Sequence, residues 1–317
     1  MTTVMFATPG YTTSSALIAE FRGVYEELHL KLLAAGLVVA DDTGQLDFST
    51  IKAYTQEGNY GYRIYQLADG NQLPIYLKIE FTCASQNGSQ VPWSLWVSMG
   101  FGTDGAGNLT NSSGRFRIGA TYYLIYRASA INAPLTSLIS VSNGFIGVSW
   151  KQLIGNPHNT YGPGTSNADA PSLASFFVCR DTDDAGNPTS DGATLVLAPA
   201  GGVSTSSGFG GAPTAVHISS GGVVTASSRI CLNIGSDAVS AVGGKLPIYN
   251  LYTMTPTPRR LAQLFSVARS PGAMGNDEFQ AAAVGTTQRN FIAMNPVWPG
   301  DILVNASVRS CIAMLWE

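Results

Sequence analysis

The sequence contains few charged residues. Asp, Glu, Lys and Arg make up 12% of its 317 residues, about half of the roughly 25% that is usual in soluble proteins. Acidic residues number 20 and basic residues 17, so the net charge is −3. A nucleic-acid-binding protein normally carries a clear basic excess that neutralises phosphates. We therefore expect no direct nucleic-acid partner.

Long hydrophobic runs are also missing. The most apolar stretch, residues 16–40, is interrupted by charged side chains such as Glu20, Arg22 and Lys31, whereas a transmembrane helix needs about 18 or more consecutive apolar residues. Residues 1–10 lack the basic and apolar segments of a secretion signal. With 45% hydrophobic residues, the chain is nevertheless too apolar to be disordered. We expect a folded protein that is made in a cytoplasm and has no membrane partner.

Cysteine is scarce, and its spacing does not predict a metal site. The four cysteines lie far apart and form no CxxC pair, which argues against zinc. We expect buried thiols that pack as small apolar side chains, and disulfides remain an alternative for a particle that matures outside a cell. The cysteines are Cys83, Cys179, Cys231 and Cys311.

Histidine is equally rare and does not predict a catalytic triad. His29 falls in a helical pattern, His158 in a loop and His217 in an alternating apolar segment. The sequence contains no GxSxG motif that would present a serine nucleophile. We therefore expect no enzymatic activity.

Two motifs resemble ligand sites but lack an essential part. Residues 100–105 match GxGxxG, yet the glycine-rich residues after them cannot open the helix that a phosphate cradle needs. Residues 181–186 begin like a calcium loop, but Ala185 and Gly192 stand where ligands are required. We expect turns at both places, without a cofactor or a metal. The remaining alternative is a calcium site at Asp181, Asp183 and Asp191.

An N-terminal helix is predicted over residues 12–36. Apolar residues recur there at three- and four-residue steps, and Gly36 stands where a helix C-terminal glycine belongs. This apolar face must pack within the subunit or on a neighbour. Its residues, taken as candidate interface residues, are Leu17, Phe21, Val24 and Leu28.

From Phe48 onward, short apolar runs alternate with turn residues. Pairs such as Asn143–Gly144 are typical of tight hairpins, whose turns need positive φ. The pattern predicts a mainly β fold, with antiparallel β-sandwich or barrel-like domains behind the N-terminal α-helix. The expected strands are Tyr60–Leu67, Ile75–Thr82, Ser94–Met99, Phe116–Arg127, Phe145–Trp150, Ser175–Arg180, Thr194–Ala198, Val223–Leu232, Pro247–Met254 and Ile302–Met314.

Changes in composition divide the chain into four parts. Residues 1–45 form an N-terminal helical segment, and residues 46–155 a first β region. Residues 156–172, rich in Pro, Gly and Asn, form a loop or linker before a second β region at residues 173–317. The sequence leaves open whether the two β regions make one domain or two. A Gly- and Ser-rich stretch at residues 199–213 predicts a further long loop.

A sequence with few charges and many aromatic residues favours a protein that assembles. A free monomer usually has a surface that is about 25–35% charged, so a surface poor in charge suggests that neighbouring subunits cover much of it. Trp93, Trp96 and Trp298 join the helix face as candidate interface residues. The alternative is a sugar-binding platform formed by Trp93, Trp96, Trp150 and Trp298.

Three parts of the sequence resemble virion structural proteins of tailed bacteriophages, of the kind encoded among tail and baseplate genes. The first is residues 61–70 running into residues 73–81. The second is Trp93–Gly100. The third is Phe176–Asp181, with its Asp- and Gly-rich turn and Ala193–Leu195. The resemblance implies strands that place an apolar face inward, and it carries over no catalytic residue.

This resemblance implies a structural component of a tailed-phage particle, with the tail or baseplate favoured over a capsid or collar position. Its partners would be other copies of itself and neighbouring virion proteins, bound through symmetric contacts. It would be found in the virion after assembly in the host cytoplasm. The alternative function is a receptor- or glycan-binding β-sandwich module at the tail tip, with a host-surface glycan as its partner.

Overall fold

The computed structural model covers the whole chain and describes residues 2–8, 17–51, 58–83, 93–119, 135–153, 171–198, 214–227, 230–231, 248–253, 259–268, 278–281, 288–294 and 310–316. It contains the helix α1 (Leu17–Ala34) and the short 3-10 helix η1 (Phe48–Thr50). The strands are β1 (Thr2–Thr8), β2 (Leu37–Val39), β3 (Gly58–Leu67), β4 (Ile75–Cys83), β5 (Trp93–Gly100), β6 (Gly102–Thr103), β7 (Leu109–Thr110), β8 (Phe116–Gly119), β9 (Leu135–Ser142), β10 (Phe145–Leu153), β11 (Pro171–Thr182), β12 (Pro188–Ala198), β13 (Thr214–Ser219), β14 (Val224–Ser227), β15 (Ile230–Cys231), β16 (Ile248–Thr253), β17 (Arg259–Ala268), β18 (Glu278–Ala281), β19 (Arg289–Met294) and β20 (Ser310–Leu315).

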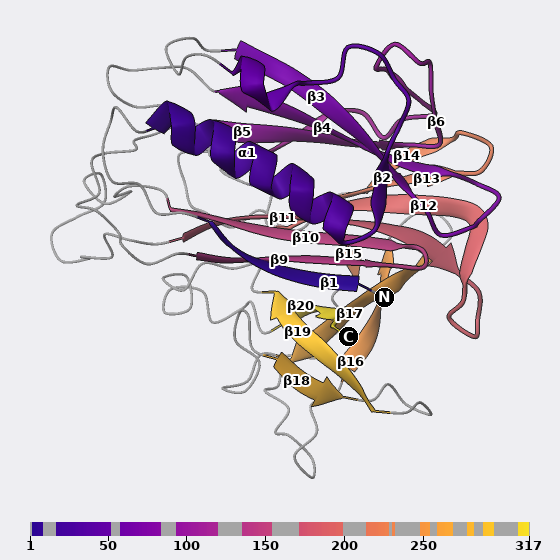
Figure 1. Cartoon of the computed structure of the whole chain (residues 1–317). Helices are drawn as coiled ribbons and strands as arrows, with labels where there is room; N and C mark the ends of the chain where they lie inside the picture. The colour runs from indigo at the N-terminus through magenta and orange to yellow at the C-terminus, as the bar shows by residue number, and fades with distance from the viewer. Residues whose placement is uncertain are drawn as a thin grey trace, which may run out of the picture.

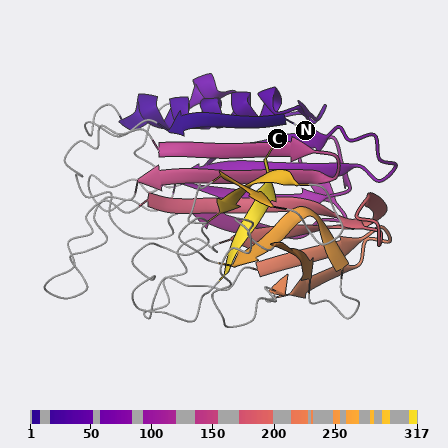
Figure 2. The same cartoon turned by 90° about the horizontal axis from the view of Figure 1, so that it is seen from below.

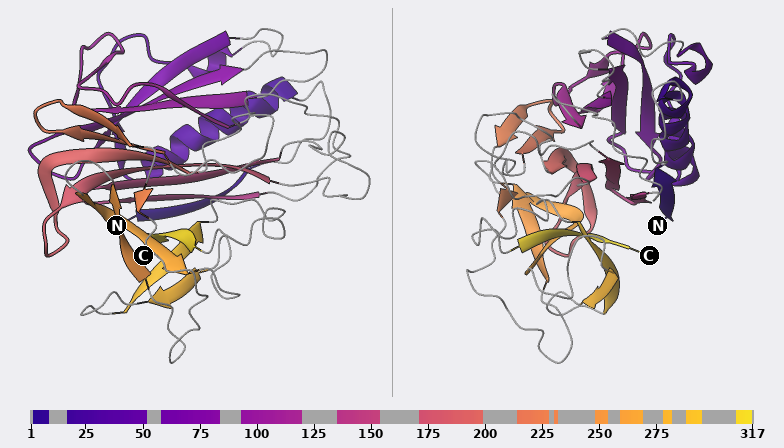
Figure 3. Two further views of the ribbon diagram at one scale, coloured as in Figure 1. Left: turned by 180° about the vertical axis from the view of Figure 1, so that it is seen from behind. Right: turned by 90° about the vertical axis from the view of Figure 1, so that its left-hand side faces the viewer.

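The described strands form three layers, seen one above the other in Figure 1. A five-stranded sheet has the order β2-β3-β4-β5-β8. A 13-stranded sheet supplies the other two layers. We call β1 and β9–β14 the central sheet, and β15–β20 the C-terminal sheet. Figure 3 shows the five-stranded sheet and α1 on one side of the central sheet and the C-terminal sheet on the other. The mainly antiparallel β fold with an N-terminal helix is thus confirmed.

The helix packs on the five-stranded sheet through the apolar face that the sequence predicts. Leu28, Leu32 and Ala35 are buried in the main core, and the hydroxyl of Tyr25 donates to the carbonyl of Thr82 on β4 at 2.8 Å. The helix ends before Gly36, which has a φ of +103°. Glycine is the only kind of residue that takes this conformation without strain. In Figure 2, α1 runs alongside β1, the edge strand of the central sheet.

The central sheet is buried on both faces. Phe176 and Val178 of β11 face the main core, where they meet residues of the five-stranded sheet. Phe177 and Cys179 of the same strand face the C-terminal sheet and contact Leu264 and its neighbours. A strand that is covered on both sides needs apolar residues at every position, not at alternate ones. This explains the unbroken apolar run at the centre of β11.

The structure contains strands that the sequence analysis did not predict. The first 45 residues hold β1 and β2 as well as the helix. Strands β6, β7, β9, β13, β17, β18 and β19 were also not predicted. The single strand expected at Val223–Leu232 is two strands, β14 and β15, which pair in different parts of the sheet. The end of the expected strand Phe116–Arg127, and the stretch 199–213, lie outside the described residues.

The two predicted β regions meet directly. β10 and β11, which lie on either side of the predicted linker at residues 156–172, are adjacent antiparallel strands. The main core contains residues from both regions, for example Phe81 and Val178. Most of the linker lies outside the described residues, which resume at Pro171.

Burial of His29 makes the stability of this core dependent on pH. Its Nδ1 lies 3.0 Å from the hydroxyl of Tyr65. Burial, with a smaller contribution from the charge of Arg63, lowers the pKa of His29 from 6.5 to about 4. The unfolded chain therefore takes up a proton at a higher pH than the folded chain does, so His29 destabilises the fold increasingly as pH falls from 6.5 to about 4.

We predict that His29→Gln removes this contribution. The free energy of unfolding, measured with urea at several pH values, should fall less steeply in the variant than in the natural protein as pH drops from 6.5 toward 4. Tyr65→Phe, which keeps the imidazole, serves as the control and should retain the natural pH dependence. Equal pH slopes in His29→Gln and the natural protein would show that His29 is not the titrating group.

Candidate functional site

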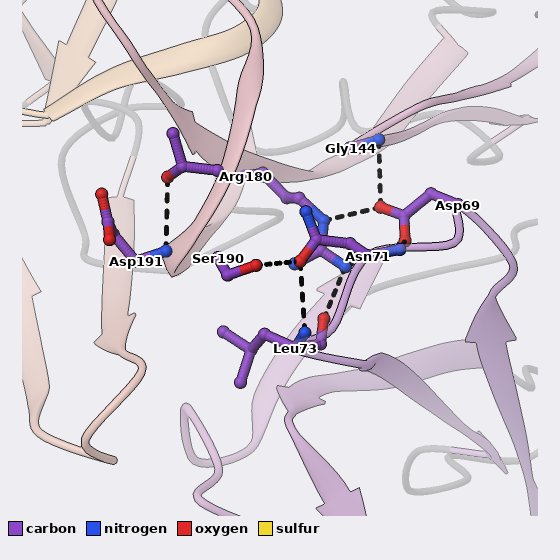
Figure 4. Close-up of polar contacts among 8 residues, drawn as sticks. Asp69, Asn71, Leu73, Gly144, Arg180, Ser190 and Asp191 are labelled. Carbon is purple, nitrogen blue, oxygen red and sulfur yellow. Dashed lines mark hydrogen bonds and ion pairs between the residues drawn. The ribbon is translucent and has the colours of Figure 1, made fainter.

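The most developed polar site lies where the turn between β3 and β4 meets the central sheet. Asp69 and Leu73 belong to this turn, and Arg180 lies on β11. The guanidinium of Arg180 holds the carboxylate of Asp69 through two bonds, Nε to Oδ2 at 2.6 Å and Nη2 to Oδ1 at 3.0 Å. Nη2 also donates to the carbonyl of Leu73 at 2.6 Å. Figure 4 shows this paired geometry.

Further hydrogen bonds join this pair to the β9–β10 turn and to strand β12. Oδ2 of Asp69 accepts from the backbone N–H of Gly144, in the β9–β10 turn, at 3.2 Å. Gly144 returns a bond through its carbonyl, which accepts from the backbone N–H of Arg180 at 2.8 Å. Asn71 bonds through its side chain to the hydroxyl of Ser190, on β12. We call Asp69, Asn71, Gly144, Arg180 and Ser190 the turn node.

Because Asp69 and Arg180 are buried, each depends strongly on the other. The side chains of Arg180 and Asp69 are 0% and 2% exposed. Removing two charges from water is costly, and only a close, fully bonded partner compensates for it. Because both carboxylate oxygens are used inside the protein, the node fixes the β3–β4 turn against the β9–β10 turn and β12, and it is not arranged to act on a bound molecule.

A second polar cluster lies between the central and C-terminal sheets. Nε2 of His217, on β13, is 3.0 Å from Oδ2 of Asp181, on β11. The intervening strand β12 carries Gly192 at this point. A Cβ there would lie 2.7 Å from Nε2 of His217 and 3.0 Å from Oδ2 of Asp181, so glycine is required for the two to meet. Arg259 approaches the same oxygen at 4.0 Å.

The thiol of Cys179 is not arranged as a nucleophile. Cys179, two residues before Asp181 on β11, is a free and fully buried cysteine. Burial and the nearby charge of Asp181 raise its pKa well above the ordinary value. The reactive form of cysteine is the thiolate, so Cys179 acts as a packed apolar residue, as the sequence predicts.

Two loops have the sequence Asp-x-Ala-Gly-Asn and the same bonding. In residues 104–108 and 183–187, the backbone N–H of the Asp donates to the carbonyl of the Asn at 3.0 Å. The Asn backbone and side-chain amide both donate to the Asp carboxylate. The hydrogen bond from the Asn side-chain amide is the main cause of the lowered pKa of Asp104 and Asp183. Both segments are turns, as the sequence analysis expects.

The calcium alternative at Asp181, Asp183 and Asp191 finds no support. Asp183 is bonded to Asn187, and Asp181 faces His217. Among the residues that the structure describes, no group of three or more His, Cys, Asp or Glu side chains could hold a metal ion.

The candidate interface residues are distributed as follows. Leu28 is buried in the subunit's own core, which is one of the two placements expected for the helix face. Leu17, Phe21 and Val24 lie in α1 and Trp93 in β5, but their side chains lie outside the described part. Trp298 and the whole of its segment also lie outside it, as do the side chains of Cys83, Cys231 and Cys311.

Trp96 is the tryptophan of this set whose surroundings are known. The guanidinium carbon of Arg115 lies 4.1 Å from the centre of its ring, and Nε of Arg115 is bonded to Glu80. One ring face is therefore occupied by a cation–π contact within the protein. The sugar-binding alternative for the tryptophans stays a prediction.

Sequence reasoning missed the turn node. Its detectable signals were the Asp69–Gly70–Asn71 turn and an arginine directly after the apolar run of β11, where a charge would be buried.

Comparison with protein families, with curated proteins and with solved structures finds no match for this chain. In the described part, no helix is both long and apolar enough to cross a membrane.

We predict that breaking the buried pair of the turn node is strongly destabilising. Arg180→Met leaves the Asp69 carboxylate buried without its partner and should lower the free energy of unfolding by about 3–5 kcal/mol. Arg180→Lys, which cannot bond in two places, should also be destabilised. Urea unfolding followed by circular dichroism measures the loss.

The matched control is the exposed pair between Lys31 and Glu27 on α1, whose Nζ and Oε1 atoms lie 3.2 Å apart. Glu27→Gln should change the unfolding free energy by at most about 0.5 kcal/mol. If Arg180→Met proved as mild as Glu27→Gln, the turn node would not hold the layers together.

Proposed function

We propose that this chain is a structural subunit of a tailed-bacteriophage particle and that it acts by assembly. Its partners are other copies of itself and neighbouring virion proteins, and a place in the tail or baseplate is favoured over the capsid or collar. The observation that carries this proposal is the turn node. Its charged groups are buried and bonded to each other and to turn backbones, which fixes the shape of the subunit.

A fixed shape suits a protein that makes repeated contacts, because each contact then needs little further ordering of the chain. The low charge of the sequence, 12%, supports the same use. Assembly also requires an exposed apolar surface that a neighbouring chain can cover.

One such surface lies on the outer side of α1 and on β2. Leu30 and Val38 are each 51% exposed, and β2 is in contact with α1. The helix residues Gly23 and Ala34 on the same side are also exposed and uncharged, and the Glu27–Lys31 ion pair lies beside them. We assign this face, opposite the buried Leu28, as a contact for the next subunit.

The test is the mass of the purified full chain, measured by light scattering over a concentration series. We predict a discrete or concentration-dependent oligomer, and a shift toward the monomer in Leu30→Asp and Val38→Asp. Val223→Asp is the matched control, because Val223 is 65% exposed but lies in the turn before β14.

The control variant should assemble like the natural protein. A natural protein that stays a monomer at the highest concentration would contradict the assembly proposal. Equal loss of assembly in Val38→Asp and Val223→Asp would contradict the assignment of the α1 and β2 face.

A further inference from the structure

The C-terminal sheet is joined to the central sheet at a narrow contact. In the described part of the chain, β11 and β17 share one residue pair, Asp181 with Leu261. By contrast, β10 and β11 are paired continuously from Phe145 to Leu153. The remaining contact between these layers is apolar side-chain packing together with three long side-chain hydrogen bonds. Ser140 donates to the carbonyl of Leu315 at 3.4 Å, Thr182 to the carbonyl of Arg260 at 3.5 Å, and Arg260 to the carbonyl of Asp184 at 3.4 Å. Such a contact can slide more easily than a continuous ladder of backbone hydrogen bonds.

The strands are irregular at the same place. The register of β11 with β12 shifts between Arg180 and Thr182. The register of β16 with β17 shifts between Asn250 and Tyr252. Within this second shift, Gln263 has a φ of +57°, a conformation that strains a residue other than glycine. Residues strained in this way persist only where the surrounding structure holds them, and they cluster at functional sites and switch regions.

The polar groups at this contact are incompletely bonded. Oδ2 of Asp181 faces His217 and, at 4.0 Å, Arg259. Its other oxygen, Oδ1, is buried and has no hydrogen-bond partner in the described structure, and the same is true of the hydroxyls of Thr194 and Thr253. Thr194 pairs with His217, and Thr253 with Arg259, so these groups lie around one junction.

The buried aspartates at the turn node and at the β11–β17 contact therefore differ in how many of their oxygens are bonded. Both oxygens of Asp69 are bonded. The buried atom without a partner at that site is Nη1 of Arg180, whose guanidinium is held by three other bonds. Asp181 has one oxygen bonded and one free. Buried polar atoms without partners are rare in folded proteins, and a second arrangement that satisfies them is one physical reason for keeping them.

We propose that the β11–β17 contact is a joint at which the C-terminal sheet opens and shifts against the central sheet. In the shifted position Arg259 comes into direct contact with Asp181, and the free oxygen of Asp181 gains a donor. The strained Gln263 is the point at which β17 bends. This inference concerns the isolated subunit and goes beyond the assembly proposal, so either one can fail without the other.

The test is hydrogen–deuterium exchange of the full chain, read by mass spectrometry. Peptides from β16, β17 and β20 should exchange on the order of tenfold or more faster than peptides from β4 and β10, because the C-terminal sheet opens as a unit without global unfolding. Asp181→Asn removes the charge that Arg259 meets in the shifted position, so it takes more interaction from that position than from the closed one. It should therefore slow exchange in the C-terminal sheet and leave β4 unchanged.

Two further variants make the result decisive. Asp191→Asn changes an exposed aspartate on the neighbouring strand β12 and should leave the exchange pattern as it is. Gln263→Gly relieves the strained backbone and should slow the opening, and it decides the question if Asp181→Asn does not fold. Exchange of the C-terminal and central sheets at one common rate in the natural protein would overturn the joint. Equal effects of Asp181→Asn and Asp191→Asn would also overturn it.

Discussion

The ion pair between Asp69 and Arg180 determines how the layers of this protein meet. A sheet sandwich is held mainly by apolar packing, which has little directional preference. The bidentate pair adds direction, because a carboxylate and a guanidinium match in one plane and at one distance. Since the pair is buried and tied to Gly144, the β3–β4 turn has one position on the central sheet.

The same reasoning distinguishes the contact between the five-stranded and central sheets from the contact between the central and C-terminal sheets. Around Asp69 both carboxylate oxygens have donors, and the guanidinium of Arg180 is held by three bonds although its Nη1 has no partner, so the carboxylate has one favoured position. Around Asp181 one oxygen is unbonded, and the nearby Gln263 is strained. A subunit built in this way combines a rigid sandwich with a C-terminal sheet that can change position. Both properties suit a protein whose work is to join neighbours in an assembly.

Local signals in the sequence were sufficient for the fold class. The apolar spacing of residues 17–35 predicted the helix face, and turn pairs such as Asn143–Gly144 predicted hairpins. The pairing of β1 with β9 could not be predicted in this way, because it joins segments more than a hundred residues apart and depends on the finished fold. The bond between Asp69 and Arg180, 111 residues apart, is hidden for the same reason.

The central claim is that Asp69 and Arg180 act as one unit, and a double-mutant cycle tests it most directly. The variants are Asp69→Leu, Arg180→Met and the two combined, each measured by urea unfolding. The account predicts that the double variant is no less stable than either single one, with a coupling free energy of about 2 kcal/mol or more. Losses that simply add in the double variant would contradict it, because independent residues would then be stabilising the two layers.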